Sequence, residues 1–271
     1  MLSCLPFALV DINDERSSFF GYLLGMAEYT AVTATEDIVS KSGGIVIAEG
    51  RGLDASLAEG LLDIQLTKPI DELLVLQTVM SIDELFDKVY SSINTDTSVA
   101  EFVRQHNNED EIRSCCANTL GFPILQQRLT VLSDCLGEVF DQGLFSAWFG
   151  VLAMSSMKRS AFDIHTIFCA ALCHDIGMLN IPGSLVRKKK ALSSPEWECL
   201  RRHPTIGYQM LCTIPDLPKD ISRAVLEHHE HLDGTGYPRG LTSSMISRHG
   251  QLLGLLDSMN RVYCKRYRAG G

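Results

Sequence analysis

Four separated pieces of the sequence carry side chains suited to binding a metal ion. Imidazole nitrogens and carboxylate oxygens together suit divalent iron, manganese or zinc, and none of the four pieces contains a cysteine. A single inward-facing histidine is more often a hydrogen-bonded core residue than a ligand, so the prediction depends on all four pieces meeting at one point. The pieces are His174 with Asp175, His203, the adjacent His228 and His229, and Asp257.

Three other histidines are expected to have structural or surface roles. His165 lies nine residues before His174, which is roughly 13 Å along a helix and too far to share a metal. His231 and His249 are expected at the surface or in turns.

The helices that must position these groups have recognisable ends. Ser160 with Asp163 is typical of a capping box that begins a helix. Gly177, followed by Pro182, is expected to end the same helix. Ser194-Pro195 is expected to open the next helix, with Ser194 as its N-cap.

A later helix is expected to start at Asp220 and to end at Gly234. On this helix His228 and His229 fall on the apolar inward side, whereas Glu227 and Glu230 tend toward another face. Convergence of several such helices on one point is how bundle-core metal sites are built.

The N-terminal part has a different pattern. Short strand-like runs at 7–12, 29–35 and 43–50 surround a helical segment at 15–29, and the pattern is helical from about Ile82 onward. The polar stretch 94–114 is expected to be a surface connection. The predicted fold is therefore α+β overall, with a small mixed α/β accessory domain of unknown role over 1–115 and an all-α domain over 116–271.

Charge and composition favour a cytoplasmic protein that acts on a small anionic substrate. Residues 1–157 hold 8 lysines and arginines against 23 acids, whereas residues 158–271 hold 16 against 10 and seven of the eight histidines. The overall charge of −9 is unfavourable for binding a nucleic acid polymer. No signal peptide is expected, because the N-terminus has no basic region and reaches acids within a dozen residues. No membrane span is expected, because the longest uncharged run, 142–157, is too short. The odd count of nine cysteines argues against a disulfide framework.

The pieces also resemble a known family. In order and separation, "HDIG…IP", "HPTIGYQML", "HHEHLDGTGYPRGL" and "LLDSM" are similar to the motifs of the HD-GYP domain, a branch of the HD phosphohydrolases. The resemblance covers roughly residues 120–271. It implies a bacterial metal-dependent phosphodiesterase that hydrolyses cyclic di-GMP to pGpG or GMP, with His174 and Asp175 as catalytic residues.

The resemblance also implies further roles. Two or three divalent ions, iron or manganese, would be bound by the four pieces together with Glu138. Glu230 and Asp233 would hold the loop that follows the histidines, and diguanylate cyclases would be partners through the GYP region. The substrate would be contacted by Gly236, Tyr237, Pro238 and Arg266.

Three positions depart from the family pattern. Met178 stands where the family has a phosphate-contacting lysine, and Gln142, one turn after Glu138, stands where it has a histidine. An amide is a poor metal ligand beside imidazole. Ala269 stands where a basic residue is expected, in a chain that stops at "KRYRAGG".

These departures leave two other functions open. The domain could bind cyclic di-GMP without turning it over, as a sensor or a protein-interaction module. It could also act on another cyclic dinucleotide or nucleotide. The oligomeric state is left open by the sequence.

Overall fold

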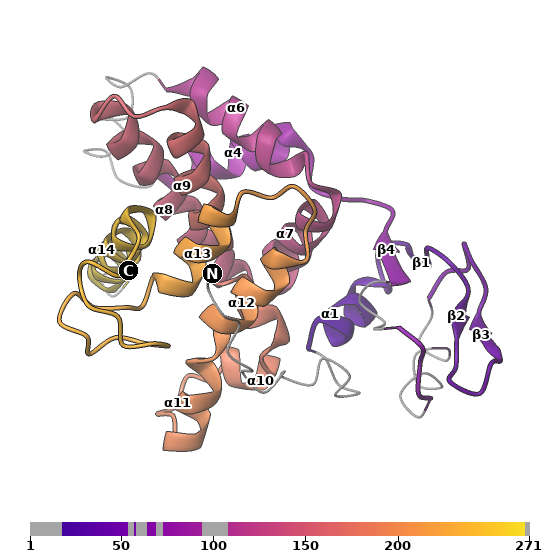
Figure 1. The fold of residues 1–271 in the computed structure, drawn as a ribbon. Coiled ribbons are helices and arrows are strands. Elements are labelled where there is room, and N and C mark those ends of the chain that lie inside the picture. The colour runs from indigo at the N-terminus through magenta and orange to yellow at the C-terminus, as the bar shows by residue number, and fades with distance from the viewer. Residues whose placement is uncertain (1–17, 54–56, 58–63, 69–72, 94–107, 269–271) are drawn as a thin grey trace. The chain divides into compact units, whose positions relative to one another are not determined.

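The computed structural model describes residues 18–53, 57, 64–68, 73–93 and 108–268 (Figure 1). The chain divides into two compact units, which are considered separately. One comprises Met1–Thr78 with Leu179–Arg187, and the other comprises Val79–Met178 with Lys188–Gly271. The predicted strand at 7–12 lies outside the described residues.

Within its described residues, the first unit contains one longer helix and two small antiparallel sheets. Its apolar core includes Phe19 and Leu23 of the helix, and the two sheets pair β1 with β4 and β2 with β3. The predicted helix and the strands at 29–35 and 43–50 are confirmed, whereas the sequence did not reveal β2 and β4. The elements are α1 (Ser18–Met26), β1 (Val32–Ala34), β2 (Ile38–Val39), β3 (Ile45–Ile47), β4 (Leu74–Leu76) and α10 (Gly183–Val186).

Within the described residues of the second unit, the regular elements are helices joined by loops, apart from an isolated bridge between Asp233 and Thr242. Its helices are α4 (Ile82–Ile93), α6 (Glu109–Leu120), α7 (Pro123–Cys135), α8 (Gly137–Ser156), α9 (Ala161–Cys173), α11 (Ser194–Leu200), α12 (His203–Cys212), α13 (Lys219–Glu227) and α14 (Arg248–Arg268). A short 3-10 helix, η1 (Ile176–Asn180), begins in this unit.

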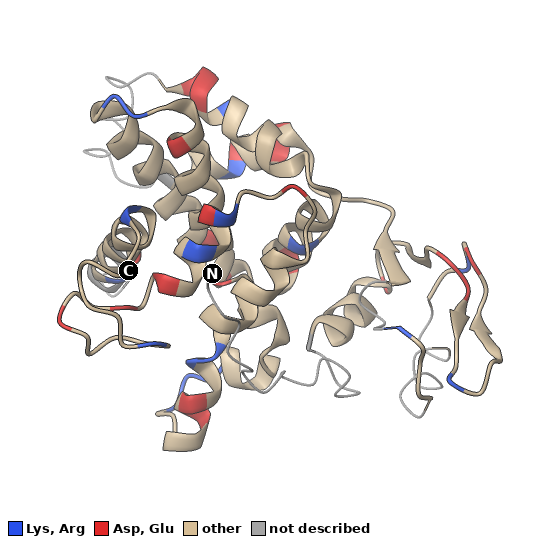
Figure 2. Cartoon of the chain, in the orientation of Figure 1, with Lys and Arg blue, Asp and Glu red and all other residues tan. Residues whose placement is uncertain are grey.

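The core of this unit is formed by α8 and α9, which pack along each other. Both helices are almost free of charge beyond their first turns, and their ribbons are mostly tan in Figure 2. Phe140, Trp148 and Phe168 are among their buried side chains. Helix α13 packs against α9, α12 and α14, so it joins the elements that carry the predicted ligands.

The apolar segment that runs from α9 into η1 meets the length and composition of a membrane span. It covers Ala161–Asn180, and 72% of its most apolar window is buried inside the protein. The core helix of a folded protein meets the same criteria. The uncharged run 142–157, predicted to be a buried helix, forms most of α8.

Three helix ends differ from the sequence prediction. Helix α9 ends at Cys173, with His174 as its C-cap, so Gly177 lies in η1 and does not cap α9. The capping box of α11 uses Ser193 with Glu196, one residue earlier than predicted. Helix α13 ends at Glu227, well before Gly234, so His228 and His229 follow the helix and do not lie within it.

The predicted connection at 94–114 is wrong over its last residues. Glu109–Leu120 forms α6, and three acids occupy its first turn, where they favour the positive end of the helix dipole. Both α4 and α6 belong to the second unit, which begins at Val79. The division into accessory and catalytic domains at 115/116 remains a prediction.

Candidate metal centre and its loop

Three histidines present the same ring nitrogen to one point. In each ring, Nδ1 lies within hydrogen-bond distance of the backbone carbonyl oxygen three residues earlier. Because a carbonyl oxygen can only accept a hydrogen bond, Nδ1 carries the proton and Nε2 is left with a free lone pair. The three bonds run from His174 Nδ1 to Ala171 O (2.8 Å), from His203 Nδ1 to Leu200 O (2.7 Å) and from His228 Nδ1 to Val225 O (2.6 Å). This arrangement fixes the tautomer that a metal ion requires.

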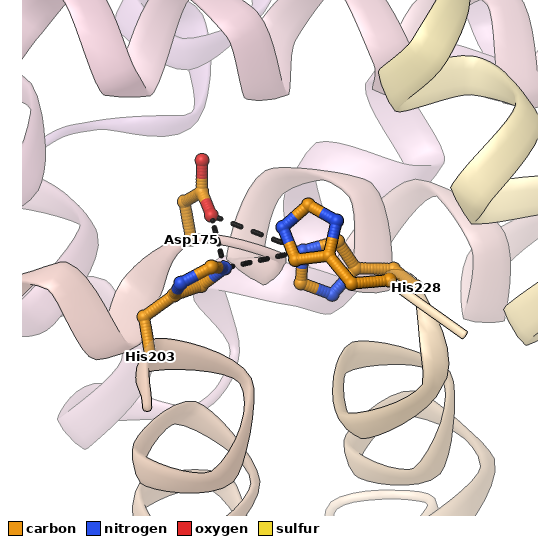
Figure 3. A group of neighbouring side chains, drawn as sticks. Asp175, His203 and His228 are labelled. Carbon is orange, nitrogen blue, oxygen red and sulfur yellow. Dashed lines mark hydrogen bonds and ion pairs between the residues drawn. The ribbon is translucent and has the colours of Figure 1, made fainter. Parts of the chain in front are cut away.

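Asp175 lies close to the ring nitrogens of His203 and His228 (Figure 3). Its Oδ1 is 3.0 Å from His203 Nε2 and 3.9 Å from His228 Nε2, and its Oδ2 is 3.2 Å from His174 Nε2. One donor atom from each of Asp175, His203, His228 and His229 lies within 4.8 Å of the others. The four come from three separate parts of the chain.

Two buried atoms at this point lack a hydrogen-bond partner. They are His174 Nε2 and Asp175 Oδ1. A buried lone pair without a partner is costly, and a divalent cation would satisfy both atoms. The donor set of imidazoles and a carboxylate therefore fits a divalent metal.

Asp257 and His229 extend the cluster toward α14. Asp257 Oδ1 lies 4.0 Å from His174 Nε2, and Asp257 Oδ2 lies 3.7 Å from His229 Nδ1. Asp257 is 3% exposed, and its Oδ2 also accepts a hydrogen bond from Arg261. The structure thus brings the four predicted pieces together.

The electrostatics of the cluster are those of buried opposite charges. Burial opposes a charge on His174, but the adjacent Asp175 carboxylate outweighs it and raises the pKa of His174 to about 9, so a metal ion bound at Nε2 would displace a proton. Burial alone would raise the pKa of Asp175, yet His174 and His203 hold it well below its ordinary value. Burial and the neighbouring histidines lower the pKa of His228, and they lower that of His229 to about 3.

A close backbone contact places His203 beside Asp175. A Cβ built on Gly177 would lie 2.1 Å from His203 O and 2.7 Å from Gly207 N. Only glycine allows η1 to approach α12 this closely. Gly177 therefore has a packing role in the site, and it does not end a helix.

The loop after the histidines is tied back to them. Tyr237 N donates to His229 O (3.0 Å), and the Tyr237 ring lies 4.7 Å from the His229 ring. The Arg201 guanidinium lies over the same Tyr237 ring, 4.4 Å from its centroid. A Cβ on Gly236 would lie 2.2 Å from His231 N, so only glycine fits there.

Two acids hold this loop as predicted. Glu230 Oε1 accepts from Arg239 N (2.6 Å) and its Oε2 accepts from Leu241 N (2.8 Å). Asp233 Oδ1 accepts from the backbone N–H (3.0 Å) and the hydroxyl (2.7 Å) of Thr235. The loop thus has a fixed conformation beside the cluster.

Sequence reasoning missed Glu227, which was expected on a different face from the histidines. Its side chain is fully buried and accepts from Arg223 Nε (2.9 Å), Arg239 Nη2 (3.1 Å) and Ser247 N (2.7 Å). It therefore links α13 to the loop and to the start of α14. The spacing of Arg223 and Glu227, four residues apart, was the available signal.

Other predicted residues lie outside the cluster. Glu138 is exposed on the first turn of α8, and the structure does not bring it into the group of four. Gln142 is half-buried, and its backbone carbonyl accepts from Asn260 Nδ2 (3.2 Å). Met178 is half-buried in η1. Arg266 belongs to α14, but its side chain is outside the described residues.

The histidines expected to be structural stay away from the metal ligands. His165 Nε2 lies 3.5 Å from Thr119 Oγ1. His231 is exposed, as expected, and its Nδ1 lies 3.0 Å from Thr235 Oγ1. The expectation for His249 is wrong: it lies in α14 with its side chain only 13% exposed, and its Nε2 lies 3.3 Å from Asp163 Oδ1.

Comparison with known families accounts for this arrangement. Residues 95–270 match the family described as HD domain. The chain belongs to the HD-domain family. The resemblance to its HD-GYP branch is confirmed, and the matched range includes His174 and Asp175, the predicted HD pair.

The curated relatives of this HD-domain chain are named as phosphodiesterases. This chain is 38% identical over 105 residues to a cyclic di-GMP phosphodiesterase of Borreliella burgdorferi, and the match covers 37% of this chain and 27% of the relative. It is 36% identical over 105 residues to one of Pseudomonas aeruginosa, covering 37% and 25%. It is 36% identical over 101 residues to a 3'3'-cGAMP-specific phosphodiesterase of Vibrio cholerae, covering 37% and 22%. The matched part is thus about a quarter of each relative.

Proposed function

We propose that this chain is a metal-dependent phosphodiesterase that hydrolyses cyclic di-GMP to pGpG or GMP. The observation that carries the proposal is the convergence of three Nε2 lone pairs on Asp175, with two buried atoms lacking a hydrogen-bond partner. The names of the relatives support the substrate class.

The metal centre is proposed to contain two or three divalent ions, iron or manganese. Ions bound there lower the pKa of a water molecule and neutralise charge that develops on the phosphoryl oxygens. The residues proposed to hold them are Glu138, His174, Asp175, His203, His228, His229 and Asp257. Asp175 would hold ions through both of its oxygens, because the two oxygens face different histidines.

The reaction adds water across one phosphodiester bond to give pGpG, and a second addition of the same kind gives two molecules of GMP. The oxygen of water bonds to phosphorus, the P–O bond to the ribose breaks, and the departing ribose oxygen takes up a proton. The carboxylate of Asp175 would orient the water, because it is the acceptor at the centre of the cluster. Gly236, Tyr237 and Pro238 would border the substrate, and Arg266 would contact phosphate.

The proposal extends to location and partners. The protein would act in the cytoplasm of a bacterium. The region around Tyr237 would be the surface through which diguanylate cyclases bind.

Turnover of cyclic di-GMP with product analysis tests the proposal. Protein loaded anaerobically with Fe²⁺ or Mn²⁺ is expected to produce pGpG or GMP, and His174→Ala and Asp175→Ala are expected to abolish turnover. His165→Gln is the matched control, since His165 lies on α9 but outside the cluster, and it should retain turnover. Absence of product under both metals would refute the phosphodiesterase proposal.

A non-catalytic function is a second candidate, and one observation favours it. Glu138 is exposed and Gln142 offers only an amide, so the donors expected from α8 are weaker than the rest. Such a domain would bind cyclic di-GMP without hydrolysing it. Equilibrium binding without product would identify this function, and the same assay with 3'3'-cGAMP would identify the alternative substrate.

A further inference from the structure

Arg261 contacts a predicted metal ligand directly. Its guanidinium Nη2 donates to Asp257 Oδ2, one helical turn earlier on α14. Among the ion pairs of the described residues, this pair alone joins an arginine to a carboxylate of the cluster. Arg261 was not singled out from the sequence.

The two oxygens of Asp257 have different neighbours. Oδ1 faces the Nε2 of His174, at 4.0 Å, whereas Oδ2 faces Arg261. A guanidinium on Oδ2 therefore fixes the rotation of the carboxylate and leaves Oδ1 directed into the cluster. Arginine is suited to this, because its planar fork holds a carboxylate in a defined orientation.

The rest of the guanidinium remains accessible. The Arg261 side chain is 52% exposed, whereas the Asp257 side chain is 5% exposed. Arg261 and His229 both line a cavity of about 700 Å³, so an anion entering that cavity meets free N–H donors next to the cluster. Arginine has five N–H donors and can bind a carboxylate and a phosphate at the same time.

The pair links a buried carboxylate to an exposed guanidinium, so loss of Arg261 also removes a partner from a buried charge. The contact therefore needs a test that separates function from folding.

We propose that Arg261 orients Asp257 for the metal centre and donates hydrogen bonds to the phosphate of the substrate. This inference rests on the proposed phosphodiesterase function for the identity of the substrate. The anion-binding part depends only on the chemistry of phosphate.

The experiment compares Arg261→Met and Arg261→Lys with Arg248→Met. Arg248 is the matched control, because it is exposed on α14 and lines the same cavity without an ion pair to the cluster. Calorimetric titration with inorganic phosphate, with and without Mn²⁺, measures anion binding without turnover. Thermal unfolding of each variant verifies that the fold is intact.

Arg261→Met is expected to weaken phosphate binding by about 10-fold, the effect of one or two charge-assisted hydrogen bonds. Arg261→Lys should recover part of the affinity, and Arg248→Met should stay within about 2-fold of the unmodified protein. With cyclic di-GMP, Arg261→Met should raise KM more than it lowers kcat.

Equal phosphate affinity of Arg261→Met and Arg248→Met would overturn the inference, as would an unmodified protein that binds no phosphate. Phosphate binding that depends on Arg261 in a protein without turnover would refute the phosphodiesterase function and keep the inference. If the protein turns over cyclic di-GMP but Arg261→Met changes neither phosphate binding nor KM, the phosphodiesterase function is kept and the inference about Arg261 is refuted.

Discussion

The Cβ position of Gly177 lies 2.1 Å from the carbonyl oxygen of His203. This contact joins the segment after the HD pair to the first residue of α12, and so it sets the distance between Asp175 and His203. An added methyl group must move one backbone away from the other.

Gly177→Ala is therefore expected to destabilise the protein by about 1–3 kcal/mol, the usual cost of forcing atoms into a packed contact. It should also weaken Mn²⁺ binding, because His203 moves with α12. Urea unfolding and a metal titration measure the two effects. Gly137→Ala is the control, since a Cβ there meets nothing within 4 Å. Equal stability of the two variants would show that the contact is not restrictive.

Glu227→Gln is expected to destabilise the protein by about 2–3 kcal/mol, because a buried carboxylate with three donors loses its charge. Glu84→Gln is the comparison: Glu84 is half exposed and lies 3.9 Å from Lys88, so its loss should cost less than about 0.5 kcal/mol. Chemical unfolding of both variants gives the difference. A Glu227→Gln protein as stable as Glu84→Gln would contradict the linking role of Glu227.

Glu230→Gln should loosen the loop without unfolding the helices. The carboxylate accepts from two backbone N–H groups, and an amide can accept through only one of its two terminal atoms. Hydrogen exchange at Arg239 and Leu241 is expected to accelerate by about 10-fold. Asp233→Asn is the control, because its bonds are confined to Thr235. Unchanged exchange at both amides would exclude this role.

Gln142→His is expected to raise the metal content of the protein. Gln142 is on α8, which packs against both α9 and α14, and imidazole is a far better ligand than an amide. Elemental analysis should show up to about one additional ion per chain. Asp141→His is the control, because Asp141 is exposed and points about 100° away around the helix. Equal metal content in the two variants would refute the prediction that Gln142 occupies the position of a metal-binding histidine in the family.

The ligands could be predicted because each lies next to a local signal. Ser160 caps α9 as expected, and the adjacent His228 and His229 are conspicuous in any reading of the chain. The structure confirms that Asp175, His203 and this pair meet.

Features that depend on distant partners could not be predicted. Glu227 is buried because Arg239 and Ser247, 12 and 20 residues later, supply its donors. Strand β4 was missed because its partner β1 is about forty residues earlier, and three-residue strands carry little periodicity. Gly177 looked like a helix end, since its close approach to His203 is visible only in three dimensions.

Metal content of anaerobically purified protein tests the central claim most directly. The account predicts about two iron or manganese ions per chain, their loss in His174→Ala and Asp175→Ala, and their retention in His165→Gln. A protein that remains free of metal after loading with Fe²⁺ or Mn²⁺ would contradict it, because the buried nitrogen and oxygen atoms of His174 and Asp175 would then have no cation to bind.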